Sequence, residues 1–300
     1  MPRLQRPPLG ATTHLGSELW SDGRHSVLRC DACGFAHLDP LPTADELRAF
    51  YATEFYGSVV PQYLDEPDAD TLAWSATAFD DRLALIAQFT DGRALLDLGA
   101  GRGSFVEHAR GRGWDAAALE PSSQAATALR ARGIRCHEGL VEDLEPEPIF
   151  DAVTAVMLLE HVLDPAAVLA RARGWLRDGG VALIAVPNEF NLLQRELMAQ
   201  GAQAWFVAPK LHLNYFDFAS LEALLMRGGL EPVARTTTFP MALFALLGDD
   251  FVASPELGPA CHGRRKHLDT SMTPEGRREL YTRLASVDLG RHAIVAARKV

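Results

Sequence analysis

The sequence predicts an α/β fold in which a doubly wound, mostly parallel sheet carries helices on both faces. Two observations predict it. From Arg93 onward, short β-branched or leucine-rich runs alternate with helical patterns. The first of these runs, Leu95–Leu98, ends in a turn with glycines at positions 99, 101 and 103, after which a helical pattern begins. Right-handed crossovers between such strands place a functional site at their carboxyl ends.

The alternation predicts seven strands with helices before and between them. We expect strands at residues 94–98, 115–120, 133–137, 150–157, 181–187, 231–237 and 292–297. We expect helices at residues 76–89, 103–112, 122–132, 165–176 and 217–228. The last strand follows its predecessor after about fifty residues, so we expect it to insert antiparallel beside the others.

Composition limits the class of protein. A chain of 300 residues with 48% hydrophobic content can form one large domain and an accessory segment. The net charge of −10 argues against a nucleic-acid partner. No apolar run approaches the length of a membrane span, and no signal-peptide core follows the first residues. Four irregularly spaced cysteines do not make a disulfide framework. We therefore expect a cytoplasmic monomer or homodimer.

Residues 1–75 are expected to form the accessory segment, which begins with a loose arm over residues 1–24. Cys30 and Cys33 then flank a turn between two strand-like runs, a pattern typical of a zinc knuckle. A closed zinc site needs four ligands, and the chain has no second Cys-x-x-Cys. Three nearby histidines are available as further ligands: His14, His25 and His37. The alternative, which we prefer, is a hairpin whose thiols only pack, so the prediction assigns no metal ligand.

A helix should follow this hairpin, because Thr43 and Glu46 form a capping box. It runs into Phe50 and Tyr51. Four aromatic residues come next, and they either close over a ligand or pack into the core: Phe55, Tyr56, Tyr63 and Trp74.

The glycine turn predicts a particular kind of ligand. A dinucleotide turn has glycines at its first, third and sixth positions, whereas here position 104 is a serine. Asp97 precedes the turn and suits an ammonium or a sulfonium better than two phosphates. Glu120 lies 19 residues beyond Gly101, close to the spacing of an acid that binds ribose hydroxyls. A ribose with positive charge and no pyrophosphate describes S-adenosylmethionine (SAM).

At these residues the chain resembles the class I (Rossmann-like) SAM-dependent methyltransferases, over residues 76–300. The matching motifs are Asp97-Leu-Gly99-Ala-Gly101-Arg-Gly103, Glu120-Pro121-Ser122, Phe150-Asp151, Leu159-Glu160-His161-Val-Leu-Asp164-Pro165, Gly179-Gly180 and Val186-Pro187-Asn188. The resemblance implies SAM as cofactor and a set of cofactor-binding residues: Asp97, Gly99, Ala100, Gly101, Gly103, Glu120, Pro121, Val141, Glu142 and Leu158. Val141 and Glu142 stand in for the family's adenine-contacting aspartate, because Leu140 occupies that position.

The accessory segment also resembles part of a methyltransferase subgroup. Cys30 and Cys33-Gly, followed by Pro-x-Pro-Thr and Phe50-Tyr51, are similar to the amino-terminal part of enzymes from bacterial sugar, glycan and natural-product pathways. Members of that subgroup commonly carry an earlier cysteine pair, which this sequence lacks.

The acceptor of the methyl group should bind where polar and aromatic residues follow the later strands. His161 follows the fourth strand, where it either faces the methyl group or caps the loop. Residues 188–218 read as an acceptor lid, because this connection is too long for a plain loop. We predict catalytic roles for His161, His212 and Tyr215, and acceptor contacts for Asn188, Trp205, Asn214 and Phe216.

The resulting hypothesis is a methyltransferase that acts on a hydroxyl or carbon of a small molecule, such as a sugar or secondary metabolite. One alternative makes SAM itself the substrate, as in an internal cyclisation. Another is a SAM-binding or partner-binding module without catalysis. A helical insert is expected over residues 239–290, where apolar residues 239–248 precede a basic stretch at 261–267. This pair suits a lipid-linked or phosphate-bearing acceptor, or else a buried helix or dimer contact.

Overall fold

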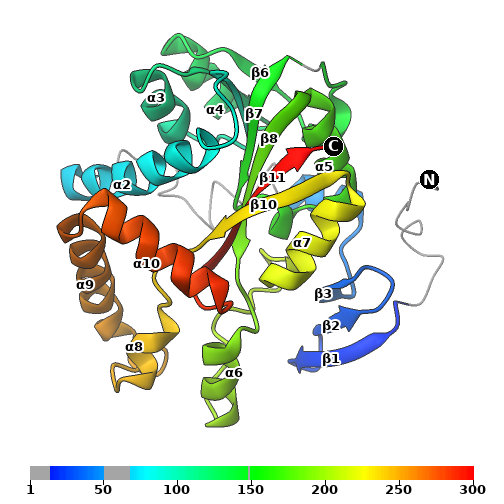
Figure 1. The fold of residues 1–300 in the computed structure, drawn as a ribbon. Coiled ribbons are helices and arrows are strands. Elements are labelled where there is room, and N and C mark those ends of the chain that lie inside the picture. The colour runs from blue at the N-terminus through cyan, green and yellow to red at the C-terminus, as the bar shows by residue number, and fades with distance from the viewer. Residues whose placement is uncertain (1–13, 51–67, 148) are drawn as a thin grey trace.

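The computed structural model describes residues 14–50, 68–147 and 149–300, which form two sheets with helices around them (Figure 1). The large sheet has seven strands in the order β10-β11-β8-β7-β4-β5-β6. These strands are β4 (Ala94–Leu98), β5 (Asp115–Glu120), β6 (Cys136–Glu138), β7 (Phe150–Val156), β8 (Leu176–Pro187), β10 (Leu230–Thr236) and β11 (His292–Lys299). Residues 1–13 of the expected arm, and the aromatic residues Tyr51, Phe55, Tyr56 and Tyr63, lie outside the described residues.

The strand order confirms the predicted doubly wound sheet. Strands β6, β5, β4, β7 and β8 pair in parallel, and β11 inserts antiparallel between β8 and β10. From β4 the chain proceeds to β5 and β6 on one side, and then to β7 and β8 on the other side. The point where the order reverses is the carboxyl end of β4, beside β7, where ligands bind in open sheets of this kind.

Helices cover both faces of the large sheet, and the alternation of β4 shows why. Leu95 packs into one core cluster with residues of α2, α3 and α4, whereas Leu96 and Leu98 pack into the other with residues of α5 and α7. The helices that flank the sheet are α2 (Ala69–Ile86), α3 (Ser104–Gly111), α4 (Ser123–Ala131), α5 (Pro165–Trp175) and α7 (Phe218–Arg227). Two short 3₁₀ turns, Val141–Asp143 and Leu159–His161, follow β6 and β7.

The small sheet is antiparallel and has the order β1-β2-β3-β9. Its strands are β1 (Gly16–Ser21), β2 (Ser26–Cys30), β3 (Phe35–Asp39) and β9 (Asn214–Tyr215). The expectation of a loose arm over residues 1–24 was wrong for residues 16–21, because β1 pairs with β2 along its length. A register shift between Glu18 and Trp20 interrupts the alternation of inward and outward side chains along this strand. The sequence therefore lacks the two-residue pattern by which a strand is usually predicted.

The helices before the large sheet begin with side-chain caps. Helix α1 (Ala44–Phe50) has the predicted capping box, in which the Thr43 N–H and hydroxyl donate to Glu46 Oε2 at 2.7 and 2.8 Å. Helix α2 begins earlier than expected, because Asp68 accepts a hydrogen bond from the Thr71 N–H at 2.8 Å. The expected domain boundary at residue 75 therefore lies inside a helix.

The chain between β10 and β11 is helical. It contains α8 (Ala242–Leu246), a 3₁₀ turn (Pro255–Leu257), α9 (Gly258–Ser271) and α10 (Pro274–Ser286). Trp74 of α2 donates a hydrogen bond from Nε1 to Asp269 of α9 at 2.7 Å, and the buried Arg265 lies over its ring. Arg264 pairs with Asp249 at 2.7 Å. These contacts join the basic stretch to the rest of the molecule.

The lid residues also contain a helix, α6 (Leu192–Ala199), whose capping box joins Asn191 and Gln194. In the described part of the chain, no helix combines the length and the apolar content that crossing a membrane requires.

Candidate active site

The turn after β4 adopts a backbone that glycine accommodates best. Gly99, Gly101 and Gly103 have φ angles of 71°, 55° and 81°. The N–H groups of Gly99 and Ala100 donate to Leu119 O at 2.8 and 3.1 Å, which holds the turn against the end of β5. The turn therefore forms a fixed cradle at the reversal point of the sheet.

Asp97 lies at the end of β4 and is buried. Its carboxylate accepts a hydrogen bond from the Thr154 hydroxyl of β7 at 2.6 Å. Burial raises the pKa of Asp97 to about 6, against the opposing effects of Thr154 and of the positive charge on Arg82. A cation bound beside Asp97 would lower this pKa and favour the ionised carboxylate. The ionised carboxylate is the form that pairs with the predicted ammonium or sulfonium.

Arg82 is a charged residue near Asp97 that the sequence analysis did not single out. It lies on α2, where its guanidinium approaches the ring of Phe79 at 5.7 Å and that of Phe105 at 6.0 Å. Burial lowers its pKa, while the charge of Asp97 raises it, so the two charges lie close enough to interact. Asp97 and Arg82 are therefore two opposite charges that influence each other's ionisation.

Glu120 ends β5 and is buried with both carboxylate oxygens facing backbone donors. Oε2 accepts from the Gly101 N–H at 2.8 Å, and Oε1 accepts from the Ser122 N–H at 2.9 Å. A carboxylate has about four acceptor positions, so capacity for ribose hydroxyls remains. Pro121 lies between Glu120 and the amino-terminal cap of α4, Ser122.

The structure gives the remaining predicted cofactor residues different surroundings. Leu158 lies against the turn, since a Cβ added at Gly99 would be 3.3 Å from its Cδ1. Val141 is buried in the core, and the pKa of Glu142 is raised by burial. The opposite charges, the fixed acid and the glycine cradle fit SAM.

Next to this cradle, the structure brings together the predicted histidines of two distant segments. His161 follows β7, and His212 lies in the lid; their ring centroids are 5.3 Å apart in an edge-to-face arrangement. His161 Nδ1 lies 2.9 Å from Leu211 O. The ring of Tyr215, the third predicted catalytic residue, lies 6.2 Å from that of His212. The three predicted catalytic residues therefore form one cluster, and catalysis by each stays a prediction.

Two buried acids that were not among the predicted site residues stand behind the imidazoles. Glu189 Oε1 lies 3.2 Å from His212 Nδ1, and Glu160 Oε1 lies 3.8 Å from His161 Nε2. The side chains of Glu160 and Glu189 are 0% and 4% exposed, against 18% and 17% for the two histidines. The acids thus lie on the protein side of the cluster.

Burial decides the charge state of this cluster. It raises the pKa values of Glu160 and Glu189 well above the usual range. It lowers the pKa values of His161 and His212 to about 4. The imidazoles are therefore neutral at neutral pH, with one nitrogen of each ring able to accept a proton.

The same cluster has the composition of a metal site. One donor atom each from Glu160, His161 and His212 lies within 4.8 Å of the others. Two imidazoles with one carboxylate are a ligand set that divalent metals use. Each histidine also has a hydrogen-bonding contact through Nδ1, His161 with Leu211 O and His212 with Glu189. Such contacts suit a group that transfers protons as well as a metal ligand.

Two of the predicted acceptor-contacting residues, Asn188 and Asn214, donate hydrogen bonds to backbone carbonyls, and their acceptor roles stay predictions. The Asn188 amide donates to Asp288 O and Gly290 O, both at 3.1 Å. The Asn214 amide donates to Leu159 O at 2.9 Å and to Val162 O at 2.7 Å. These bonds tie the lid to the loops that follow β7 and precede β11.

The two remaining predicted acceptor contacts are aromatic. Phe216 is buried, and its ring lies 5.1 Å from that of Phe35 in β3. Trp205 packs edge-to-face on Phe206 and Phe251, with centroid distances of 5.4 and 6.0 Å. The roles of Trp205 and Phe216 as acceptor contacts stay predictions.

Comparison with known proteins gives a family and several relatives. Residues 73–235, more than half of the chain, match the family model described as "Methyltransferase domain". A ubiquinone biosynthesis O-methyltransferase of Alkalilimnicola ehrlichii is 30% identical over 170 residues, which are 49% of this chain and 69% of that protein. A trans-aconitate 2-methyltransferase of a Mycobacterium species is 30% identical over 157 residues, which are 49% of this chain and 61% of that protein.

Solved structures agree with the fold. The 1,6-didemethyltoxoflavin-N1-methyltransferase of Burkholderia thailandensis, solved with S-adenosylhomocysteine, aligns with a TM-score of 0.51 at 18% identity. The alignment covers 95% of this chain and 100% of that one. It therefore extends over nearly the whole of both chains.

Proposed function

Because the chain belongs to the methyltransferase-domain family and is a SAM-dependent enzyme, we propose that it methylates a hydroxyl oxygen of a small molecule with His212 as general base. The acceptor binds at the carboxyl ends of β7 and β8, between the glycine cradle and the lid. The sequence-based expectation of a sugar or secondary metabolite is compatible with this placement. The relative from Alkalilimnicola is named as an O-methyltransferase, which supports a hydroxyl acceptor.

The observation that carries the proposal is the pairing of His212 with Glu189. When Nδ1–H of His212 donates to the Glu189 carboxyl group 3.2 Å away, the ring presents an unprotonated Nε2. A carboxyl group that orients an imidazole in this way is a recurrent arrangement for general-base catalysis. Burial keeps the pKa of His212 at about 4, so the base needs no deprotonation at neutral pH.

A hydroxyl acceptor makes use of such a base. SAM supplies a methyl group on a positively charged sulfur. The acceptor oxygen gains the methyl group, the sulfur keeps the electron pair of the broken bond, and the hydroxyl proton passes to His212 Nε2. General-base assistance of this kind contributes about 10²–10⁴-fold to the rate. An unprotonated amine already presents its electron pair and needs less of it.

His161 and Tyr215 position the acceptor in this scheme. The contact of His161 Nδ1 with Leu211 O fixes the plane of its ring beside His212. Burial raises the pKa of Tyr215, so its hydroxyl stays protonated and serves as a hydrogen-bond donor. Orientation of two reactants contributes as much as about 7–11 kcal/mol to lowering a barrier, so these contacts matter as much as the base.

The acceptor class is tested by measuring S-adenosylhomocysteine release with four probes. These are a phenol (3,4-dihydroxybenzoate), a sugar hydroxyl (methyl α-D-glucoside), an amine (benzylamine) and a carboxylate (trans-aconitate). The proposal expects methyl transfer to a hydroxyl probe and none to benzylamine. Transfer to the amine alone, or consumption of SAM without any acceptor, contradicts it.

The role of His212 is tested on the best hydroxyl probe. His212→Gln should lower kcat by about 10²–10⁴-fold, with the affinity for S-adenosylhomocysteine unchanged in calorimetry. The matched control is His108→Gln, because His108 also pairs with a carboxylate, Asp80, at 2.7 Å but lies on α3. In the wild type at saturating SAM, whose positive charge keeps Asp97 ionised, kcat/KM for the hydroxyl probe should stay level between pH 8 and pH 5.5. An unchanged kcat in His212→Gln removes His212 from the mechanism.

A further inference from the structure

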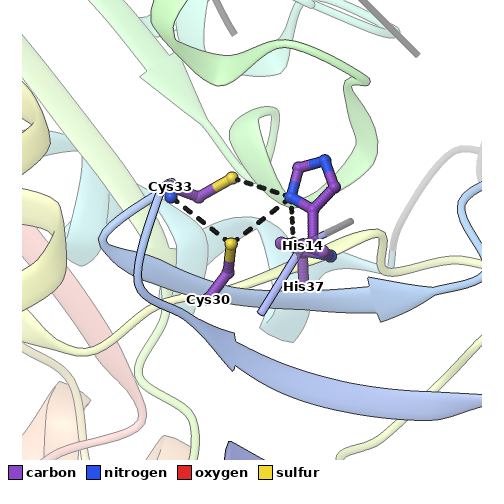
Figure 2. A group of neighbouring side chains, drawn as sticks. All are labelled: His14, Cys30, Cys33 and His37. Atoms are coloured by element: carbon purple, nitrogen blue, oxygen red, sulfur yellow. Dashed lines mark hydrogen bonds between the residues drawn. The ribbon is translucent and has the colours of Figure 1, made fainter. Parts of the chain in front are cut away.

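Four metal-ligating side chains meet in the small sheet, outside residues 73–235 that match the methyltransferase domain. Cys30 ends β2, Cys33 lies in the turn, His37 lies on β3, and His14 precedes β1 (Figure 2). One donor atom of each lies within 4.8 Å of the others. The His14 ring is directed at the two sulfur atoms and at His37 (Figure 2).

The separations of the donor atoms are those of a tetrahedral site. His14 Nδ1 lies 3.3 Å from Cys30 Sγ, 3.5 Å from Cys33 Sγ and 3.1 Å from His37 Nε2. Zn²⁺ bound at about 2.3 Å from sulfur and about 2.0–2.1 Å from nitrogen separates tetrahedral ligand atoms by about 3.3–3.8 Å. The three separations from His14 Nδ1 therefore lie within a few tenths of an ångström of those expected between ligands of one tetrahedral zinc ion.

Hydrogen bonding alone does not account for the position of His14. An imidazole nitrogen carries either one hydrogen or one lone pair, so it makes one hydrogen bond in its plane. Nδ1 of His14 has three polar neighbours at contact distance. Atoms that bind the same metal ion approach one another in this way, because all of them point at the ion between them.

The surroundings of the cluster orient its ligands. His37 Nδ1 lies 2.8 Å from Leu38 O, which directs Nε2 toward the cluster. Metal-binding histidines generally make such a contact with their second nitrogen. The Cys33 N–H points at Cys30 Sγ across 3.4 Å. Cys30 and His37 are 1% exposed and Cys33 is 8% exposed, which suits a closed site.

We propose that His14, Cys30, Cys33 and His37 bind one structural Zn²⁺. Two sulfur and two nitrogen ligands in a closed tetrahedral arrangement favour zinc among the common metals. This proposal replaces the preference, drawn from the sequence, for thiols that only pack. His25, the third histidine considered there, is not part of the site, because its Nδ1 lies 3.6 Å from Asp22.

The zinc site would link the amino-terminal sheet to the acceptor lid. His37 is the register partner of Asn214 in β9, and the Leu38 N–H donates to Leu213 O at 2.8 Å. The Arg227 guanidinium of α7 also donates to Cys33 O at 2.7 Å. Residue 214 is two positions from His212. If His212 is the base proposed above, loss of zinc should lower turnover by loosening its support.

Metal content tests the site without any activity measurement. The full chain, purified without added metal, should contain about one zinc per molecule by inductively coupled plasma mass spectrometry. Cys30→Ser and His14→Ala should each lower the zinc content at least fivefold. The matched controls Cys136→Ser and His25→Ala, outside the cluster, should keep it. A wild-type protein that contains no zinc and takes up none from solution overturns the proposal, as does equal loss in ligand and control variants.

Cobalt substitution covers the case in which the ligand variants do not fold. Wild-type protein exchanged into Co²⁺ should show the strong visible absorption of tetrahedral cobalt and a sulfur-to-cobalt charge-transfer band. Weak absorption typical of six-coordinate cobalt, or no bound cobalt, contradicts the site. Because these readouts do not depend on catalysis, the zinc proposal can hold where the His212 proposal fails, and the reverse.

Discussion

The Gly101 backbone N–H donates a hydrogen bond to Oε2 of Glu120 across 2.8 Å, although the two residues lie 19 positions apart. The contact joins the turn after β4 to the end of β5. One carboxylate thus holds the turn at which we expect the methionine part of SAM and stands where we expect its ribose. Cofactor affinity and the shape of the turn should therefore depend on the same residue.

Replacing Glu120 should weaken cofactor binding. Hydrogen bonds to a charged group contribute about 1.5–3 kcal/mol, so Glu120→Ala should raise the Kd for S-adenosylhomocysteine roughly 10–150-fold in calorimetry. Glu138→Ala is the matched control, because Glu138 ends the neighbouring strand β6 and pairs with Arg130 at 2.8 Å on the surface. Unchanged affinity in a folded Glu120→Ala protein would sink the ribose assignment.

A methyl group at Gly103 should destabilise the fold. Its φ of +81° is unfavourable for alanine, and an added Cβ would overlap with Cδ2 of Leu129, which is fully buried. Left-handed strain of about 1–2 kcal/mol and overpacking of about 1–3 kcal/mol should both lower the free energy of unfolding. Urea denaturation of Gly103→Ala measures their sum.

Gly113 separates the two effects. Its φ is +85°, close to that of Gly103, but an added Cβ would have no atom within 4 Å. Gly113→Ala should therefore show the strain without the overlap and lose less stability than Gly103→Ala. Equal losses in the two variants would mean that Leu129 moves aside at no cost and that the turn is looser than described.

Glu160 should make stability depend on pH. Burial raises the pKa of Glu160 in the folded protein well above its ordinary value of 4.5, so its stabilising contribution is complete below pH 4.5 and is lost as the pH rises toward the folded pKa. Glu160→Gln removes this loss. The free energy of unfolding of the variant, relative to wild type, should increase by about 1.4 kcal/mol per pH unit above pH 4.5. Chemical denaturation at pH 5, 6 and 7 measures the slope.

Glu138→Gln provides the control with the opposite sign. The pKa of Glu138 is lowered, first by the Ser123 hydroxyl and then by Arg130, so its contribution is present above pH 4.5 and lost on acidification. Between pH 5 and pH 7 this variant should show no increase relative to wild type. A flat difference for Glu160→Gln would show that Glu160 is ionised in the folded protein.

The sequence predicted the large sheet and the cofactor cradle because local patterns encode them. The apolar run before Asp97 and the three glycines specify a strand and a turn without reference to distant residues. The seven strands followed from the regular alternation, and β8 differs mainly in its early start at Leu176, where it pairs with Phe150.

The sequence did not reveal the groups that act through distant contacts. Arg82 lies on α2, where the spacing of apolar residues indicates only an amphipathic helix. Its electrostatic interaction with Asp97 depends on how that helix packs against the sheet. Glu189 is one of several acids after an apolar strand, and only the fold brings it to His212. The available signal was the position of Glu189, directly after Val186-Pro-Asn188 at the carboxyl edge of the sheet.

The two-residue strand β9 has a consequence for transplanting specificity between enzymes of this family. Its only strand partner in the described structure is β3, about 180 residues earlier in the chain. A lid of residues 188–218 grafted onto another methyltransferase would lose that edge and the support it gives to His212. To transfer acceptor preference to another enzyme, a chimaera should therefore need two segments of this chain, the lid and residues 14–39 of the small sheet.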